Sequence, residues 1–125
     1  MAESKVTRND SILKTIAKLV GGEENGDYFN PDLIVAINTA LAVLTQLGVG
    51  PKNGFMIEDD QSKWSDFIGD DKRLSMIVSY VHLKTSLIFD PPTSSVVKEA
   101  RESLVNEMEW RSFAAAEAIS RESGE

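Results

Sequence analysis

The sequence predicts an all-α fold: a small single domain of four main helices plus one short helical turn, with a long loop between the second and third helices. Three observations support this. Several segments repeat apolar residues at helical spacing, capping residues and prolines mark helix starts, and no stretch alternates apolar and polar residues over the length of a strand. The 125 residues, 42% hydrophobic and 26% charged, suit one domain with a modest core.

The first predicted helix, ILKTIAKLV, covers residues 12–20 and follows a polar segment, residues 1–9, that we expect to be flexible. Two glycines, Gly21 and Gly22, end the helix. Its N-cap is one of three adjacent polar residues: Asn9, Asp10 or Ser11. Its apolar face is formed by four residues at helical spacing: Ile12, Ile16, Leu19 and Val20.

The second predicted helix starts within YFNPDLI, residues 28–34. Asn30 is a good N-cap, and Pro31 fits the first helical position, where no amide hydrogen is needed. Phe29 and Ile34 have the spacing of a hydrophobic staple across this helix start. The helix is apolar over most of its circumference. We therefore expect it to be buried on more than one side, either centrally in the monomer or against a neighbouring subunit.

A long connection, residues 48–63, leads to the short helical turn KWSDFIG, which its apolar residues anchor on the core. Asp70 or Asp71 then opens a long helix, KRLSMIVSYVHLKTSLIF. Most of this helix is apolar. Its polar residues recur at i, i+4, i+7 and i+11, which predicts one solvent-facing stripe on a mostly buried helix: Ser75, Ser79, His82 and Ser86.

LIFDPPT, residues 87–93, ends the long helix at a doubled proline. Pro91 disfavours helical geometry at Asp90 and forces a rigid corner, which aims the last helix. The predicted structural corner consists of four consecutive residues: Phe89, Asp90, Pro91 and Pro92. Two caps for the last helix stay open, because Asp90 can cap it directly, or Thr93 or Ser94 can cap it slightly later.

The last predicted helix contains EMEWR, residues 107–111, and has a predicted inner face of Val97, Ala100, Leu104 and Met108. Trp110 either packs in the core or anchors an interface, since Trp and Arg are enriched in binding hot spots. The candidate interface comprises Glu109, Trp110, Arg111 and Phe113. Residues 114–125 form a tail with little to bury, which we expect to become ordered only against a partner.

The composition argues against several classes of protein. Without cysteine there is no disulfide scaffold, Cys-ligated zinc site or thiol nucleophile. A net charge of −7 and the lack of a basic cluster argue against specific nucleic-acid binding. The longest apolar stretch, residues 33–47, is too short and too polar to span a membrane, and the N-terminus shows no signal peptide.

No set of residues predicts catalysis, a metal site or a cofactor, so we expect no enzyme. His82 is the only histidine, and on its polar stripe it fits a surface or interface residue better than a catalytic base. GVGPKNG, residues 48–54, lacks the Gly-Lys-Ser/Thr of a phosphate loop. The acidic residues lack EF-hand spacing and suit helix caps and a solvated loop: Glu58, Asp59, Asp60, Asp66, Asp70 and Asp71.

The order of these motifs resembles a known family. AINTALAVLTQLGVG precedes the Trp-bearing turn KWSDFIG, which is followed by YVHLKTSLIFDPPTS and by a helix with EMEWR. Over residues 10–113 this order resembles the head–tail connector, or head-completion adaptor, family of long-tailed bacteriophages. The most specific part is FDPP after a YVxLK-like helix, joined to EWR at residues 109–111.

The resemblance implies a structural virion protein without catalytic residues. Members form a homo-oligomeric ring, commonly dodecameric, that lies under the portal, extends the DNA channel and joins the capsid to the neck or tail. The implied partners are further copies of the chain, the portal protein and the next neck protein (stopper) or a tail component. DNA passes without specific binding, and no membrane takes part. The implied location is the virion neck at the portal vertex, after assembly in the host bacterial cytoplasm.

In some relatives the C-terminal segment reaches the portal, which here implies residues 110–119 and beyond. The alternative is a general small helical protein–protein interaction module, acting as a monomer or dimer. A small enzyme or metal-binding protein built on the acidic loop is the weakest hypothesis, because it needs a site that the sequence does not contain.

Overall fold

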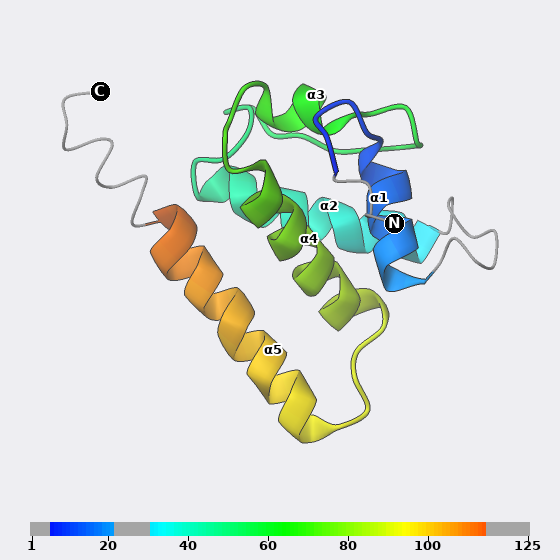
Figure 1. Cartoon of the computed structure of the whole chain (residues 1–125), viewed down its shortest axis with the longest axis vertical. Helices are drawn as coiled ribbons and strands as arrows, with labels where there is room; N and C mark the ends of the chain where they lie inside the picture. The colour runs from blue at the N-terminus through cyan, green and yellow to red at the C-terminus, as the bar shows by residue number, and fades with distance from the viewer. Residues whose placement is uncertain (1–5, 22–30, 115–125) are drawn as a thin grey trace, which may run out of the picture.

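The computed structural model describes residues 6–21 and 31–114, which form five α-helices and a terminal π-helix and contain no β-strand (Figure 1). The elements are α1 (Ile12–Val20), α2 (Pro31–Gln46), α3 (Trp64–Ile68), α4 (Leu74–Phe89), α5 (Ser95–Glu107) and the π-helix Met108–Ala114. The predicted all-α class is confirmed, with four longer helices, one short helix and a long connection between α2 and α3.

Ser11 is the residue that caps α1. Its hydroxyl oxygen accepts a hydrogen bond from the Lys14 amide at 3.1 Å. At the other end Gly21 has φ +87° and donates its amide to the carbonyls of the last turn, so the predicted glycine terminator is confirmed. Arg8, in the segment expected to be flexible, donates to the carbonyl oxygens of Gly69 and Asp71 and thereby links this segment to the turn before α4.

Helix α2 begins at Pro31, as predicted, whereas the predicted cap Asn30 and its neighbour Phe29 lie outside the described residues. One side of α2 is buried against α4 and α1, through Leu33, Ala36, Ile37, Ala40, Leu41 and Leu44. The other side carries Val35, which is 62% exposed, and the exposed Ala42. Within the described residues, this second side of α2 is only partly covered.

The connection between α2 and α3 is held by the Asn38 side chain. Its amide nitrogen donates to the Ile57 carbonyl at 3.1 Å, and its amide oxygen accepts from the Ile57 amide at 2.8 Å. Ile57 is buried, while the preceding Met56 is 66% exposed. The connection is thus fixed against α2 with Met56 directed outward.

Helix α3 supplies two of the large aromatic residues of the core. Trp64 is fully buried, and its indole nitrogen donates to the Thr15 hydroxyl at 3.2 Å. Phe67 is also buried and packs directly under Gly50, where a Cβ atom would lie 2.4 Å from the ring. Gly50 has φ +88° as well, so both the backbone and the close approach require glycine there.

Helix α4 begins at Leu74, later than the predicted start at Asp70 or Asp71. Asp71 instead orders the turn before the helix, because its carboxylate accepts from the Arg73 amide and pairs with the Arg73 guanidinium at 2.7 Å. That hydrogen bond holds the pKa of Asp71 below its usual value. The predicted helix cap is therefore a turn residue placed before the helix.

The polar stripe predicted on α4 is correct at Ser75 and Ser79, which are exposed, and wrong at Ser86, which is buried. The Ser86 hydroxyl donates to the Leu83 carbonyl of the same helix at 3.1 Å. Because its own helix satisfies the hydroxyl, Ser86 does not need solvent. His82 is half-buried, which is intermediate between the exposed serines and the buried Ser86.

The corner between α4 and α5 follows the predicted residues. Helix α4 ends at Phe89, and Asp90 has φ −146° and ψ 69°, outside helical geometry as a residue before proline should be. The cap of α5 is Ser94, whose hydroxyl accepts from the Val97 amide at 3.3 Å, so the later of the two candidate positions is used. From this corner α5 returns alongside α4 (Figure 1).

Candidate assembly interface

Helix α5 buries a single side chain, that of Val105. All residues from 95 to 104 are exposed, including Leu104 at 46% and Val97 at 41%. The predicted inner face of this helix is wrong at Val97, Ala100 and Leu104, which are exposed, whereas Met108 is partly buried against the core. The physical reason is that α5 packs closely on α4 only near its last turn, at Val105, and an open groove separates the two helices beside Glu102.

The π-helix after α5 is fixed to α4 by Glu109 and Phe113. Phe113 is fully buried and meets the Tyr80 ring edge-on, with ring centroids 5.6 Å apart. The Tyr80 hydroxyl donates to the Glu109 carboxylate at 2.7 Å, and the Lys84 ammonium lies 3.5 Å from the same carboxylate. Two residues of the predicted interface, Glu109 and Phe113, therefore face the domain.

The hydrogen bond between Tyr80 and Glu109 has an electrostatic consequence. Burial, together with the neighbouring carboxylate, raises the pKa of Tyr80 far above its ordinary value of 10.0. Tyr80 therefore stays a neutral donor, and Glu109 keeps a fixed partner on α4. This contact sets the orientation in which the chain leaves the domain at Ala114, the last described residue.

The π-helical geometry explains how Phe113 reaches the core. In a regular α-helix the eight residues from Val105 to Phe113 would leave the two side chains about 80° apart around the axis. The wider i→i+5 turns rotate the chain less per residue and offset this angle. Both Val105 and Phe113 can then face the domain. The spacing of apolar residues in the sequence does not predict this change of helix type.

Trp110 lies on the outside of the π-helix and is 73% exposed. Of the two interpretations that the sequence allows, core packing is excluded by this exposure. Arg111 is also exposed and lies 3.4 Å from Glu107, one turn earlier. The predicted interface thus separates into an inward pair, Glu109 and Phe113, and an outward pair, Trp110 and Arg111.

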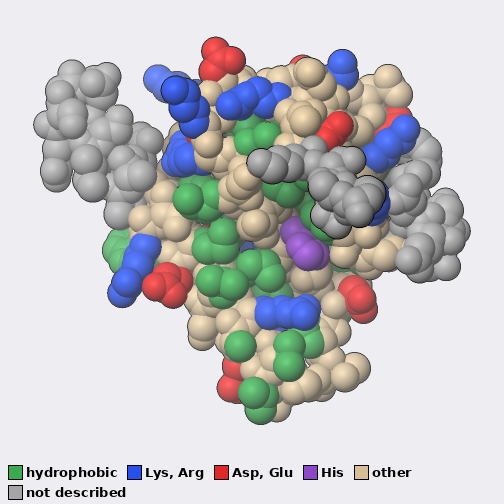
Figure 2. Space-filling view, in the orientation of Figure 1, with side chains coloured by type: hydrophobic (Ala, Val, Ile, Leu, Met, Phe, Trp, Pro, Cys, Tyr) green, Lys and Arg blue, Asp and Glu red, His purple; other side chains and the backbone are tan. Residues whose placement is uncertain are grey.

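The face formed by α4 and α5 carries many hydrophobic side chains, together with the single histidine (Figure 2). His82 is half-buried, and its pKa is lowered by burial and by the positive charge of Arg101 on α5. The imidazole is therefore neutral at neutral pH. Lysine, arginine, aspartate and glutamate side chains lie among the hydrophobic ones on this face (Figure 2), so it is a mixed surface with apolar patches.

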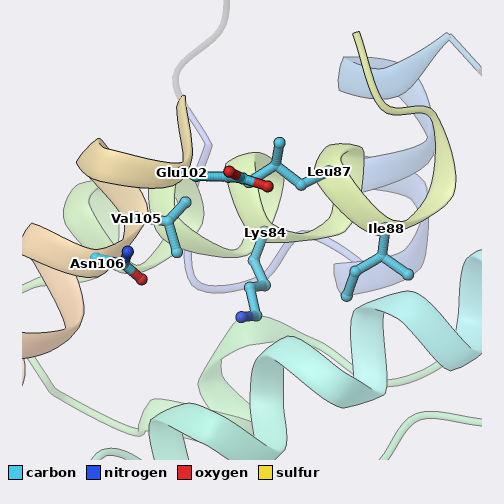
Figure 3. A pocket seen from close by; sticks show the side chains of 6 residues that line it. All are labelled: Lys84, Leu87, Ile88, Glu102, Val105 and Asn106. Atoms are coloured by element: carbon cyan, nitrogen blue, oxygen red, sulfur yellow. The ribbon is translucent and has the colours of Figure 1, made fainter. Parts of the chain in front are cut away.

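An open groove of about 350 Å³ lies between α4 and α5 (Figure 3). Val105 lies between the two helices, while Lys84 and Glu102 point to different sides of it (Figure 3). Lys84 already pairs with Glu109. The groove therefore lacks the converging ionisable groups that acid–base catalysis needs. Over the described ranges 6–21 and 31–114, no cluster of His, Cys, Asp and Glu could hold a metal ion.

None of the described helices is both long and apolar enough to cross a lipid bilayer. No curated protein and no solved structure matches the chain. A family model described as phage connector protein matches residues 12–118, which include all five α-helices and the π-helix. The chain therefore belongs to the phage connector protein family, whose members are structural components of the head–tail junction of the virion.

Proposed function

We propose that this connector assembles into a ring beneath the portal, extends the DNA channel and carries the next neck protein or a tail component. The observation that supports this most directly is the exposure of every residue from 95 to 104. A helix this short is marginal in water unless packing stabilises it. An apolar surface on such a helix is expected to be covered in the assembly.

A ring requires contacts between unlike surfaces of neighbouring copies, because such head-to-tail contacts close when the rotation between copies permits it. The uncovered apolar residues of α5 supply one such surface. The outward pair Trp110 and Arg111 is proposed to contact the portal, since the C-terminal segment reaches the portal in some relatives of the family that the sequence resembles. Tryptophan and arginine are also the residue types most enriched in binding hot spots.

The net charge of −7 suits a DNA channel. A basic wall would bind the phosphate backbone with release of counterions, whereas an acidic wall lets DNA slide past. We therefore expect the inner wall of the ring to be neutral or acidic. A strongly basic wall in an image of the assembled neck would contradict this part of the proposal.

Native mass spectrometry of the purified chain, alone and with portal protein, tests the proposed function. The expected result is a closed oligomer, formed alone or on the portal. A strict monomer that ignores the portal would overturn the proposal and favour a general interaction module. Leu104→Glu should prevent oligomer formation, while the matched control Ser103→Glu, which also places a charge on exposed α5 surface, should assemble normally.

Trp110→Ala tests the portal contact separately. The variant should fold and form oligomers like the wild type but lose portal binding in a pull-down or in native mass spectrometry. Its matched control is Glu99→Ala, which changes another exposed residue of the same helical segment. Undiminished portal binding by Trp110→Ala would remove Trp110 from the proposed contact.

A further inference from the structure

We propose that the apolar stripe of α5 in one copy docks on the outer face of α2 in the next copy. The α5 stripe is defined as Val97, Ala100, Leu104 and Met108. The α2 outer face is defined as Val35, Ala42, Phe55 and Met56. The inference rests on the proposed ring and names the two surfaces that would build it. The partner that each surface binds is a second copy of this chain.

The α5 stripe has the spacing of a helix that packs on one partner. Its members follow one another at i, i+3, i+7 and i+11 and so lie on one side of the helix. The stripe lies about a quarter of a turn from Val105, the side chain that α5 buries within the domain. Val97, Ala100 and Leu104 are exposed, while Met108 is partly buried against the core and joins the stripe to the domain. The exposed part of the stripe therefore points to the side of the α4–α5 contact, where a neighbour can reach it.

The α2 outer face is a second apolar surface without a covering element among the described residues. Val35, 62% exposed, and Ala42 are seven residues apart and thus share one side of α2. Met56, 66% exposed, and the half-buried Phe55 extend this surface from the connection that Asn38 holds in place. Beside them lies a hollow of about 450 Å³, lined by Ala42, Thr45, Asn53, Gly54, Phe55 and Met56.

The two surfaces lie on different sides of the molecule. Helix α4 packs between α2 and α5 (Figure 1). The core-facing side of α2 is turned toward α4, so Val35 and Ala42 are turned away from it. A ring contact needs two different surfaces that are well separated, whereas a symmetric dimer needs one surface that matches itself. The separation of the α5 stripe from the α2 outer face fits a ring contact.

One edge of each surface carries a charge complementary to the other surface, while the opposite edge of the α5 stripe carries Glu107, which pairs with Arg111. Arg101 is exposed and borders the α5 stripe, four residues after Val97 and three before Leu104. Glu58 and Asp59 are exposed and follow directly after the α2 outer face in the chain. A positive flank on one surface and a negative flank on the other would favour the head-to-tail register over other pairings.

A mixing experiment tests the pairing under conditions in which the wild type forms oligomers. Leu104→Glu disables the α5 stripe, and Met56→Glu disables the α2 outer face. Each variant alone should stay monomeric, because every contact between identical copies would include one disabled surface. An equimolar mixture should give one-to-one heterodimers and nothing larger, since each pair joins the two intact surfaces. Native mass spectrometry distinguishes these species.

The outcomes separate the inference from the proposed function. If Met56→Glu forms oligomers like the wild type, the α2 outer face is not the docking surface, although the ring itself stands. If Met56→Glu stops at homodimers, the stripe pairs with itself in a symmetric contact, and the inference is overturned. A wild type that never assembles, even on the portal, overturns the proposed function. Unchanged circular-dichroism melting of both variants and normal assembly of Ser103→Glu are the controls.

A charge reversal tests the register of the contact. Arg101→Glu and Glu58→Arg should each raise the concentration needed for assembly by about tenfold, because each places like charges together. The double variant on one chain should return to within about threefold of the wild type, since every contact again pairs opposite charges. Lack of recovery in a well-folded double variant would exclude this pairing of Arg101 with Glu58.

Discussion

Helices α4 and α5 are joined by one corner, and both carry apolar residues at helical spacing, but only α4 is packed. Helix α4 contacts α1, α2 and α5 and buries Ile77, Val78, Tyr80, Val81, Thr85 and Ser86. Helix α5 buries Val105 alone. The comparison teaches that a helical repeat of apolar residues predicts which side of a helix will be covered, and leaves open whether the same chain covers it.

The largest expected difference between the two helices is in their local stability. In the monomeric protein, backbone amides in the first two turns of α5 should exchange with solvent at least about 100-fold faster than those in the middle of α4. The reason is that little buried apolar surface opposes opening of α5. Hydrogen exchange followed by mass spectrometry measures this. Equal protection of both helices from exchange would mean that α5 is covered in the monomer. It would contradict the difference in packing between α4 and α5.

Two aromatic residues of the π-helix test the same comparison by substitution. Phe113→Ala should lower the free energy of unfolding by about 3–5 kcal/mol, because the ring is fully buried against Tyr80. Trp110→Ala should change it by no more than about 0.5 kcal/mol, because the indole is 73% exposed. Urea denaturation gives both values. A large loss for Trp110→Ala would mean that Trp110 stabilises the monomer itself.

The bond between Tyr80 and Glu109 joins the packed helix to the open one. Tyr80→Phe should cost about 1.5–3 kcal/mol, the usual value for a hydrogen bond to a charged group. The pKa of Tyr80 is raised above 10.0 in the folded state, so its contribution is fully present below pH 10 and is lost as the pH rises further. Urea midpoints should therefore fall less steeply in Tyr80→Phe than in the wild type above pH 10. If the urea midpoints of the two proteins fell equally above pH 10, Tyr80 would not be the source of the pH dependence.

The sequence predicted the helices of this fold well because their spacing, Pro31 and Gly21 are local signals. The choice of Ser94 over Asp90 as a cap was left open, since both residue types accept the same hydrogen bond and the turn geometry decides. The inward direction of Phe113 was missed. It depends on a π-helix, which forms where Tyr80 and Lys84 of a distant segment hold Glu109.

For the candidate site, the sequence identified the region and its apolar stripe, and it named Trp110 as a residue for an interface. It could not decide that Val97, Ala100 and Leu104 are uncovered while Met108 is partly buried, because the same spacing would suit burial of the whole stripe within the chain. That distinction depends on where the corner at Pro91 directs α5. The direction follows from the packing of several elements together and not from local residues.

The smallest expected effect is a gain in stability within the packed helix. The Thr85 hydroxyl is fully buried and has no hydrogen-bond partner within residues 6–21 and 31–114. Removing a buried polar group without a partner removes its desolvation cost, so Thr85→Val, which keeps the shape of the side chain, should stabilise the protein by about 1 kcal/mol. A threonine on the exposed connection, Thr93, provides the control, because Thr93→Val should change stability by less than about 0.5 kcal/mol. Urea denaturation of both variants measures these changes in the free energy of unfolding. A loss of stability in Thr85→Val would show that the hydroxyl has a partner, such as a bound water, and that the interior of α4 is less apolar than its packing against α1 and α2 indicates.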